Sequence, residues 1–161
     1  PMLAYCPELI KPGTVVKELV QNIDIAPTIM EACDVKKAEQ MRGRSFIPLL
    51  KGEKVDDWRK RIYYEYYWEY DFPHTPTMFG VRTDKYKLIK YHGIWDTNEL
   101  YDLENDPNEM NNLIAKPEHQ EMVKGLLEDL YDWLEATNGM NIPIKRTIKH
   151  RIGDHRNAEI Y

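Results

Sequence analysis

The sequence lacks the features that several protein classes require. Only two cysteines, Cys6 and Cys33, occur in the 161 residues, which excludes a disulfide-dense scaffold and a zinc site built from paired cysteine motifs. No apolar run approaches the roughly 20 residues that a membrane-spanning helix needs. The formal net charge is −5, so no general positive field favours nucleic acid as a partner.

Catalytic signatures are missing as well. The chain contains no Gly-rich phosphate loop, no H-E-x-x-H zinc motif and no G-x-S-x-G turn for a nucleophilic serine. Its five histidines are scattered along the chain. The residue pattern alone therefore indicates no nucleophile and no metal ligand.

The elements that are present predict an α+β fold. With 42% hydrophobic and 30% charged residues, the composition is typical of a globular protein. Alternating and aromatic stretches at 61–70, 80–91 and 98–103 predict antiparallel strands, the middle one a hairpin that turns at Asp84–Lys85. Apolar spacing from Pro117 to Ala136 predicts a long helix that covers one face of this small sheet and ends at Asn138–Gly139.

The first 60 residues predict a different kind of structure. We expect a buried strand at 2–6 and a helix that begins at Asp24 as N-cap, with Ile25, Ile29, Met30 and Cys33 on its core face. A loop with one helical turn at Pro48–Leu50 follows. Because a domain rarely opens inside a core strand, we expect the chain to be the C-terminal piece of a longer protein.

Two polar features allow more than one interpretation. Arg42 and Arg44 either tie a surface loop to neighbouring carboxylates, which we favour, or face an anion.

His74 lies between two prolines in FPHTPT, where a stiff loop can present an imidazole to a ligand. Alternatively, it bonds a backbone carbonyl. The aromatic residues before it form either a stacking wall for a sugar ring or, as we favour, sheet core: Tyr66, Tyr67, Trp68 and Tyr70.

The order of motifs resembles the C-terminal region of the type I, formylglycine-dependent sulfatases of the alkaline-phosphatase-like superfamily. The motifs are VVKELVQNIDIAPTIMEACDV, MRGRSFIPLLKG, IYYEYY, GVRTDKYKLIKY and ELYDLENDPNEMNNL, and the likeness runs from about residue 1 to 137. The tyrosine-rich strand and the passage H-T-P-T-x-x-G-V-R-T look most like N-acetylglucosamine-6-sulfatases and mucin-desulfating sulfatases.

The resemblance implies a domain organisation. Residues 1–58 would end the large α/β sulfatase domain, with its last strand, a helix and a connecting loop. Residues 59–137 would form the C-terminal subdomain of antiparallel sheet and long helix, and 138–161 a basic irregular tail. A sulfatase would also be periplasmic or secreted.

The resemblance implies hydrolysis of sugar sulfate esters, with a formylglycine nucleophile and a calcium ion. Neither Cys6, followed by PEL, nor Cys33, followed by DVK, fits the C/S-x-P-x-R signature from which formylglycine is made. We therefore expect the nucleophile and the metal ligands upstream, no catalytic residue here, and an inactive chain when isolated. His74, assisted by Thr75, is the expected contact to a substrate hydroxyl or sulfate; Arg82 is either an internal ion-pair partner or a further contact.

Two alternatives stay open at this point. The chain could be a stand-alone carbohydrate-binding or interaction module, which should not begin in a buried strand. It could also come from a related phosphodiesterase or phosphonate hydrolase, whose upstream nucleophile would be a plain Thr or Ser.

Overall fold

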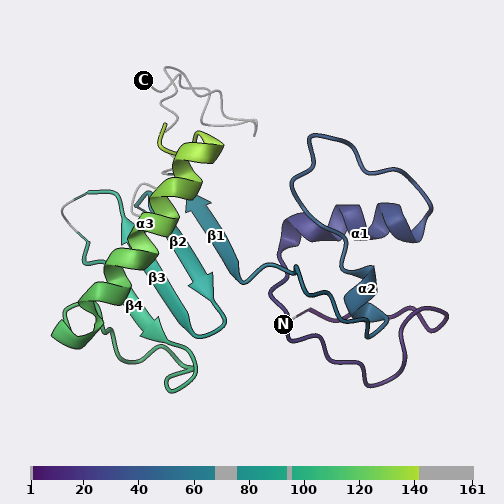
Figure 1. Ribbon diagram of the computed structural model, residues 1–161, viewed down its shortest axis with the longest axis horizontal. Helices are drawn as coiled ribbons and strands as arrows, with labels where there is room; N and C mark the ends of the chain where they lie inside the picture. Colours follow the sequence, from purple (N-terminus) through teal and green to yellow (C-terminus); the bar gives the residue numbers. More distant parts are fainter. Residues whose placement is uncertain (1, 68–75, 94–95, 142–161) are drawn as a thin grey trace, which may run out of the picture. The chain divides into compact units, whose positions relative to one another are not determined.

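The computed structural model describes residues 2–67, 76–93 and 96–141 (Figure 1). The backbone divides into two compact units, Pro1–Ile62 with Val81–Lys87 and Tyr101–Asn111, and Tyr63–Gly80 with Leu88–Leu100 and Asn112–Tyr161. The helical elements of the first 60 residues are the 3-10 turn η1 (Asn22–Asp24), α1 (Ile25–Ala32) and α2 (Ile47–Leu50).

A small apolar core organises the segment before the sheet. The buried side chains are Phe46, Leu49 and Trp58, and the partly buried residues Val16, Val20, Leu50 and Val55 pack against them. The short helix α2 turns Leu49 into this core, and Pro48 stands in its first turn, where a missing N–H costs nothing. The predicted helical turn is confirmed.

Helix α1 buries a different face from the one predicted. Ile25 and Cys33 are exposed and Ile29 is 58% exposed, whereas Pro27 and Thr28 are buried. The hydroxyl of Thr28 donates to the Asp24 carbonyl at 2.6 Å and accepts from the Phe46 N–H at 3.1 Å. These bonds turn the Thr28 side of the helix inward, so the prediction of the core face was wrong.

The strand predicted at 2–6 is also wrong. Residues 2–6 have no strand conformation and are exposed, Leu3 to 98%. A strand needs a neighbour to take its hydrogen bonds, and no strand among the described residues pairs with this segment.

The sheet has four antiparallel strands in sequence order (Figure 1). They are β1 (Arg61–Tyr66), β2 (Met78–Thr83), β3 (Tyr86–Tyr91) and β4 (Glu99–Asp102). The turn between β2 and β3 is held by Thr83, whose hydroxyl oxygen accepts the backbone N–H groups of Lys85 at 3.2 Å and Tyr86 at 2.9 Å. The predicted hairpin is confirmed.

The helix α3 (Gln120–Thr137) lies across one face of the sheet (Figure 1), after the 3-10 turn η2 (Pro117–His119). Its inward stripe is Val123, Leu126, Leu130 and Leu134. Leu88 and Leu100 of the strands and Leu130 and Leu134 of the helix are completely buried, and each such side chain contributes roughly 1.5–3 kcal/mol. The predicted α+β fold is confirmed.

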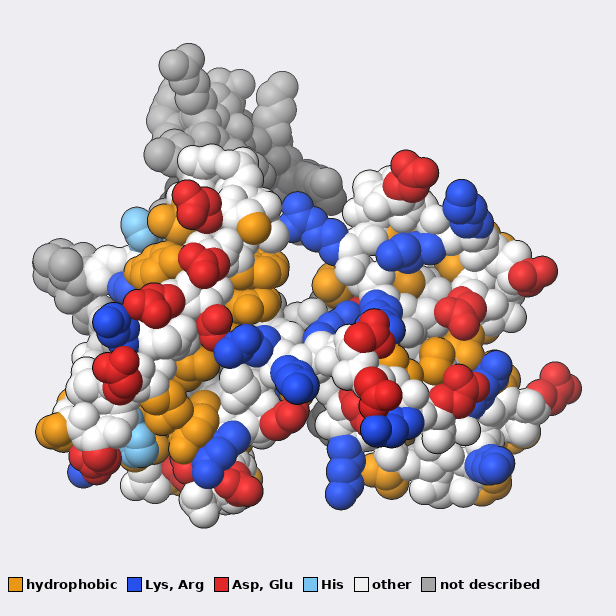
Figure 2. Space-filling model, in the orientation of Figure 1, with side chains coloured by type: hydrophobic (Ala, Val, Ile, Leu, Met, Phe, Trp, Pro, Cys, Tyr) orange, Lys and Arg blue, Asp and Glu red, His pale blue; other side chains and the backbone are white. Residues whose placement is uncertain are grey.

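The outer face of α3 is acidic. Figure 2 shows carboxylates along it, and the exposed acidic residues are Glu121, Glu128, Asp132 and Glu135. Asn138 ends the helix in the left-handed conformation, with φ 62°, which confirms the predicted cap. Within the described residues, no helix combines the length and apolar character needed to cross a bilayer.

Candidate functional site

The predicted substrate contacts, His74 and Thr75, lie outside the described residues, and their roles stay predictions. The chain on either side of them is described as far as Tyr67 and from residue 76 onward. Thr77 is buried, and its carbonyl accepts the backbone N–H of His92 at 2.9 Å. The sheet therefore fixes the chain a few residues from the predicted contacts.

A phenol–carboxylate pair ties the end of β1 to the end of α3. The Tyr67 hydroxyl donates to the Glu65 carboxylate and lies 3.0 Å from the carbonyl oxygen of Gly139. Burial, and then the hydrogen bond and charge of Glu65, raise the pKa of Tyr67 to about 12, because each disfavours the phenolate. A Cβ at position 139 would lie 2.6 Å from Oε2 of Glu65 and 2.8 Å from Cδ2 of Leu134, so only glycine fits there without displacing them.

The aromatic residues of β1 divide between the two faces of the sheet. Tyr63 stacks on Trp133 of α3 with ring centroids 4.8 Å apart, and Tyr67 meets Phe79 edge-on at 6.0 Å. Of these rings Phe79 is buried, whereas Tyr63, Tyr67 and Trp133 are half-buried, as is Tyr66. Tyr67 therefore packs within the sheet and helix unit, as we favoured. Tyr64, on the other face, is 57% exposed. Trp68 and Tyr70 lie outside the described residues.

Asn112 explains why the stretch ELYDLENDPNEMNNL needs an asparagine near its end. Its side-chain oxygen accepts the backbone N–H groups of Leu100 and Ile114, each at 3.0 Å. Its amide nitrogen donates to the carbonyl of Asn98 at 3.1 Å. One side chain thus joins the start of β4 to the segment that leads to the helix.

The aspartates of this stretch act as caps of the loop. Asp102 accepts the backbone N–H groups of Glu104 and Asn105, and the Asn105 side-chain amide holds the pKa of Asp102 below its usual value. Asp106 accepts the N–H of Asn111 at 2.7 Å. Both carboxylates are engaged by backbone donors, as is typical of turns, so this motif builds the loop and supplies no reactive group.

The hairpin is bound to that loop by two ion pairs. Lys85 lies 2.8 Å from Glu104, whose hydrogen bond and charge raise the pKa of Lys85, and Lys87 pairs with Glu109. Arg82, on the same hairpin, is exposed and makes no ion pair in the described part of the chain. The internal ion pair considered for it is not found there, and its role as a substrate contact stays a prediction.

Asp24 is the most deeply buried charge that the structure describes. Its carboxylate accepts the backbone N–H groups of Gln21 and Arg44, each at 2.8 Å, and the guanidinium of Arg59, with Nη2 at 2.7 Å. Burial alone raises the pKa of Asp24, but the Arg59 and backbone hydrogen bonds outweigh it and leave the pKa below its usual value. Asp24 precedes α1 as predicted, yet its side chain caps η1 and makes no cap bond to α1.

Two arginines near Asp24 lie over an indole ring. The guanidinium carbon of Arg44 is 4.8 Å from the centroid of the Trp58 ring, and that of Arg59 is 5.1 Å from it. Arg44 also pairs with Asp57 at 3.0 Å. The favoured interpretation, a loop tied to a carboxylate, is therefore confirmed for Arg44. Arg42 is exposed and forms no ion pair with the described residues. Gly43 permits the close approach of this loop, because a Cβ there would lie 1.9 Å from the carbonyl oxygen of Ile23.

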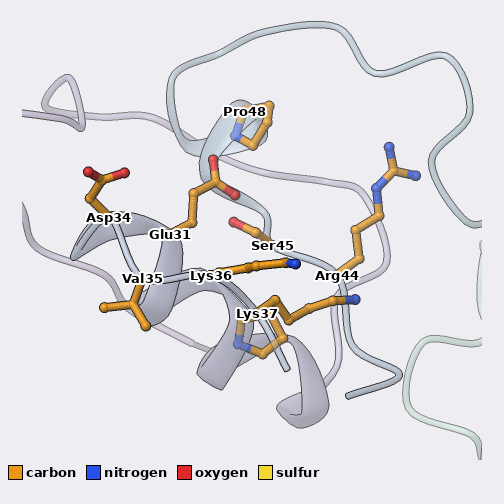
Figure 3. A pocket seen from close by; sticks show the side chains of 9 residues that line it. Glu31, Asp34, Val35, Lys36, Lys37, Arg44, Ser45 and Pro48 are labelled. Carbon is orange, nitrogen blue, oxygen red and sulfur yellow. The ribbon is translucent and has the colours of Figure 1, made fainter. Parts of the chain in front are cut away.

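A groove lies beside this loop. It has a volume of about 570 Å³ and is lined by Pro27, Glu31, Asp34, Val35, Lys36, Lys37, Arg44, Ser45 and Pro48. In Figure 3 the side chains of Lys36 and Lys37 extend toward the side from which Arg44 projects, while Asp34 projects the opposite way. The groove thus combines a cationic side with apolar surface and two carboxylates.

A family model for "N-sulphoglucosamine sulphohydrolase, C-terminal" matches residues 1–136. The chain belongs to this sulfatase family. The predicted resemblance is confirmed, and the match corresponds to the C-terminal region of the family's members.

Curated relatives agree with this assignment. The chain is 33% identical to the N-acetylglucosamine-6-O-sulfatase of Bacteroides thetaiotaomicron, over 99% of this chain and 29% of the relative. It is 29% identical to the ulvan-active sulfatase of Formosa agariphila, over 89% of this chain and 36% of that protein. The chain therefore spans only 29% and 36% of the length of these two sulfatases.

Solved structures place the fold in the same family. A protein solved with its substrate D-glucosamine-2-N,6-O-disulfate is 32% identical, with a TM-score of 0.74 over 84% of this chain and 28% of its own. A phosphonate monoester hydrolase of Agrobacterium radiobacter reaches a TM-score of 0.57 at 22% identity over 71% of this chain and 24% of its own, which shows a shared fold only.

The sulfatase family implies a bound metal ion, and the described residues do not fit one. Among residues 2–67, 76–93 and 96–141, no three His, Cys, Asp or Glu side chains gather closely enough to hold a cation. The carboxylates of the 99–113 stretch are hard oxygen donors of the kind that calcium prefers, but Asp102 and Asp106 accept backbone N–H groups instead.

Sequence reasoning missed the contacts that join distant segments. Tyr67 and Gly139 are 72 residues apart, and Asp24 and Arg59 are 35 apart. One available signal was an aspartate within an otherwise apolar stretch, NIDIAPT, which requires a buried partner if the stretch folds inward. The groove beside Lys36 had no comparable signal, because its walls come from two separate segments.

Proposed function

We propose that this chain is part of a sulfatase that hydrolyses sulfate esters of amino sugars of the glycosaminoglycan or mucin type. The observation that carries the proposal is the identity of 33% with an N-acetylglucosamine-6-O-sulfatase across 99% of the chain. The similarity to a structure that holds D-glucosamine-2-N,6-O-disulfate supports the same substrate class.

In this proposal the chain supplies scaffold and one wall of the substrate cleft. Formylglycine and calcium, which the family resemblance implies, are supplied in this proposal by upstream residues, because neither Cys6 nor Cys33 lies in a C/S-x-P-x-R signature. His74 and Thr75 contact a hydroxyl or sulfate of the sugar. The bonds of Tyr67 to Glu65 and Gly139 support this role, because they fix the strand that leads to these residues.

The upstream part of the same protein is the proposed partner of residues 1–35. Six large apolar side chains of this segment are exposed, Leu3 to 98% and Tyr5 to 91%: Leu3, Tyr5, Val15, Ile25, Ile29 and Val35. Cover by the remainder of a sulfatase, which accounts for about 70% of the relatives' length, would remove them from water. A periplasmic or secreted location is part of the proposal and rests on the family resemblance alone.

Sulfate release by the complete protein tests the function. With glucosamine 6-sulfate and calcium present, we expect inorganic sulfate to appear faster than phosphate from the matching phosphate ester. His74→Ala should lower kcat/KM about 10- to 100-fold, since a lost hydrogen bond to a charged group costs roughly 1.5–3 kcal/mol. His92→Ala, an exposed histidine at the end of β3, is the matched control and should leave kcat/KM unchanged.

Two outcomes would contradict the proposal. Release of phosphate alone would favour the phosphonate hydrolase alternative. Equal activity of the His74 variant and the native protein would remove His74 from the cleft.

A further inference from the structure

We propose that the outer face of α3 is the docking surface for the basic tail that follows it, residues 142–161 of the same chain. The face consists of the exposed acidic residues that run along the helix (Figure 2): Glu121, Glu128, Asp132 and Glu135. The tail itself lies outside the described residues. The proposal goes beyond the sulfatase function and does not rest on it.

The outer face of α3 carries more negative charge than the helix itself can balance. Lys124 is the only Lys or Arg in α3, and its ammonium lies 4.0 Å from the Glu128 carboxylate. Glu128 and Asp132 are four residues apart, and Asp132 and Glu135 are three apart, which are spacings at which like charges repel. No ion pair joins Asp132 or Glu135 to any residue that the structure describes. A cation from elsewhere would relieve this repulsion.

The repulsion is least favourable at the end of the helix. The C-terminal end of an α-helix carries partial negative charge, which cations nearby offset and anions oppose. Glu135 lies in the last turn of α3, and that turn holds no basic residue. A cation that follows the helix in the sequence would therefore offset both Glu135 and the helix dipole.

The tail carries the complementary charge. Its acidic residues are Asp154 and Glu159 alone, whereas its basic residues other than histidine are five: Lys145, Arg146, Lys149, Arg151 and Arg156. Four of these five lie within 145–151. The tail therefore concentrates its positive charge in the part nearest to α3 in the sequence.

The tail is also long enough to reach the whole face. The chain turns after α3, since Asn138 adopts the left-handed conformation and the Asn141 N–H donates to the Asn138 carbonyl at 3.3 Å. Glu121 and Glu135 are about 21 Å apart along the helix axis, a length that about seven extended residues span. Residues 142–161 exceed this requirement, so the basic stretch can lie back along α3.

Tyr131 gives the face an apolar contact in addition to its charges. This side chain is 40% exposed and lies on the same side of the helix as the carboxylates three residues before it and four after it. The tail carries apolar side chains between its cations: Ile144, Ile148 and Ile152. Single exposed ion pairs are weak, but a tethered segment has an effective concentration on the order of millimolar, so several such contacts together suffice.

The test is carbodiimide crosslinking of the complete protein, which joins a lysine amine to a carboxylate that touches it. Peptide mass spectrometry locates each link, and a mixture of isotope-labelled and unlabelled protein separates links within one chain from links between chains. We expect links within one chain from Lys145 and Lys149 to the α3 face: Glu128, Asp132 or Glu135. Their yield should fall at least about fivefold in about 1 M salt, where exposed charges are screened within about 3 Å.

Charge variants separate this contact from random collisions of the tail. Arg146→Glu combined with Arg151→Glu leaves both tail lysines in place, and it should lower the yield of their links to α3 at least about fivefold. Asp132→Lys should lower the yield of the links to the remaining α3 carboxylates by a similar factor. Asp84→Lys makes the same change at an exposed carboxylate outside α3 and should alter the yield less than twofold.

Three results would overturn the proposal. The first is the absence of links between the tail and α3 at low salt, and the second is a set of links from the tail lysines that reaches only other carboxylates or another molecule. The third is a yield in the Asp132→Lys variant equal to that of the native protein, since the contact would then be insensitive to charge. None of these results bears on sulfate release, so this proposal and the proposed function fail independently.

Discussion

Replacement of Asp24 by asparagine should be among the most destabilising single changes in the first 60 residues. The carboxylate is completely buried and meets donors only: two backbone N–H groups and both terminal nitrogens of Arg59. An asparagine keeps one oxygen and turns its NH₂ group toward these donors. The arginine, whose side chain is 20% exposed, is left without its counter-charge.

The expected cost follows from this geometry. Removal of one partner of a buried ion pair costs about 3–5 kcal/mol, and the partial exposure of Arg59 places this pair near 3 kcal/mol. The assay is urea unfolding of the complete protein, followed by tryptophan fluorescence, since Trp58 stacks on Arg59.

The pH dependence supplies an independent check. Because the pKa of Asp24 is lowered on folding, its contribution is present above the unfolded value near 3.9 and is lost as the pH falls through the folded pKa. The native protein should therefore lose stability relative to the Asp24→Asn variant below about pH 4, and the gap should be constant near neutrality. Asp57→Asn, which removes an exposed ion pair with Arg44, is the control and should show little change. A loss below about 1 kcal/mol for the asparagine variant would refute the assignment of Asp24 as a buried anchor.

Three further changes test the sheet and its helix. Gly139→Ala should lower the free energy of urea unfolding by about 1–3 kcal/mol, because its Cβ would collide with Glu65. Gly125→Ala is the control: its Cβ would meet open space, so it should raise that free energy by about 0.5–1 kcal/mol. Equal effects of the two variants would contradict the close approach at Gly139. Asn112→Ala removes three hydrogen bonds to the backbone and should lower the free energy of unfolding by about 1–3 kcal/mol. The β4 amides should then exchange hydrogen faster. Unchanged exchange would show that these bonds do not hold β4. Tyr67→Phe should remove the tyrosine that ionises near pH 12 from an ultraviolet titration, and survival of that step would assign the raised pKa to another tyrosine.

The sheet and its helix could be predicted because their signals are local. The alternation of β3 and the apolar spacing of α3 each occur within one element, and turn residues such as Asp84–Lys85 mark the ends of strands. The prediction of Asn138–Gly139 as a helix end rested on the same kind of evidence. A short-range pattern suffices when the surface that it describes is covered by a neighbouring element of the same chain.

The first 60 residues show where such reasoning fails. The periodicity of α1 identifies an apolar stripe but not what covers it, and Ile29 is exposed while Thr28 is buried. Similarly, the pattern at 2–6 favours a strand, but a strand forms only when another one pairs with it. Both errors concern surfaces that no described residue covers.

The polar stretch at 99–113 shows why family membership does not settle the substrate. Asn112 and Asp102 are occupied by backbone groups, and Lys87 by Glu109. Each of these contacts fixes the sheet and its loop in this chain, and none of them leaves a group that could distinguish one ester from another. The phosphonate monoester hydrolase with the same fold is consistent with this reasoning. We therefore expect substrate preference to reside in residues that the fold does not use, which is why variants of His74 and Arg82 test the proposed function more sharply than variants of the motif itself.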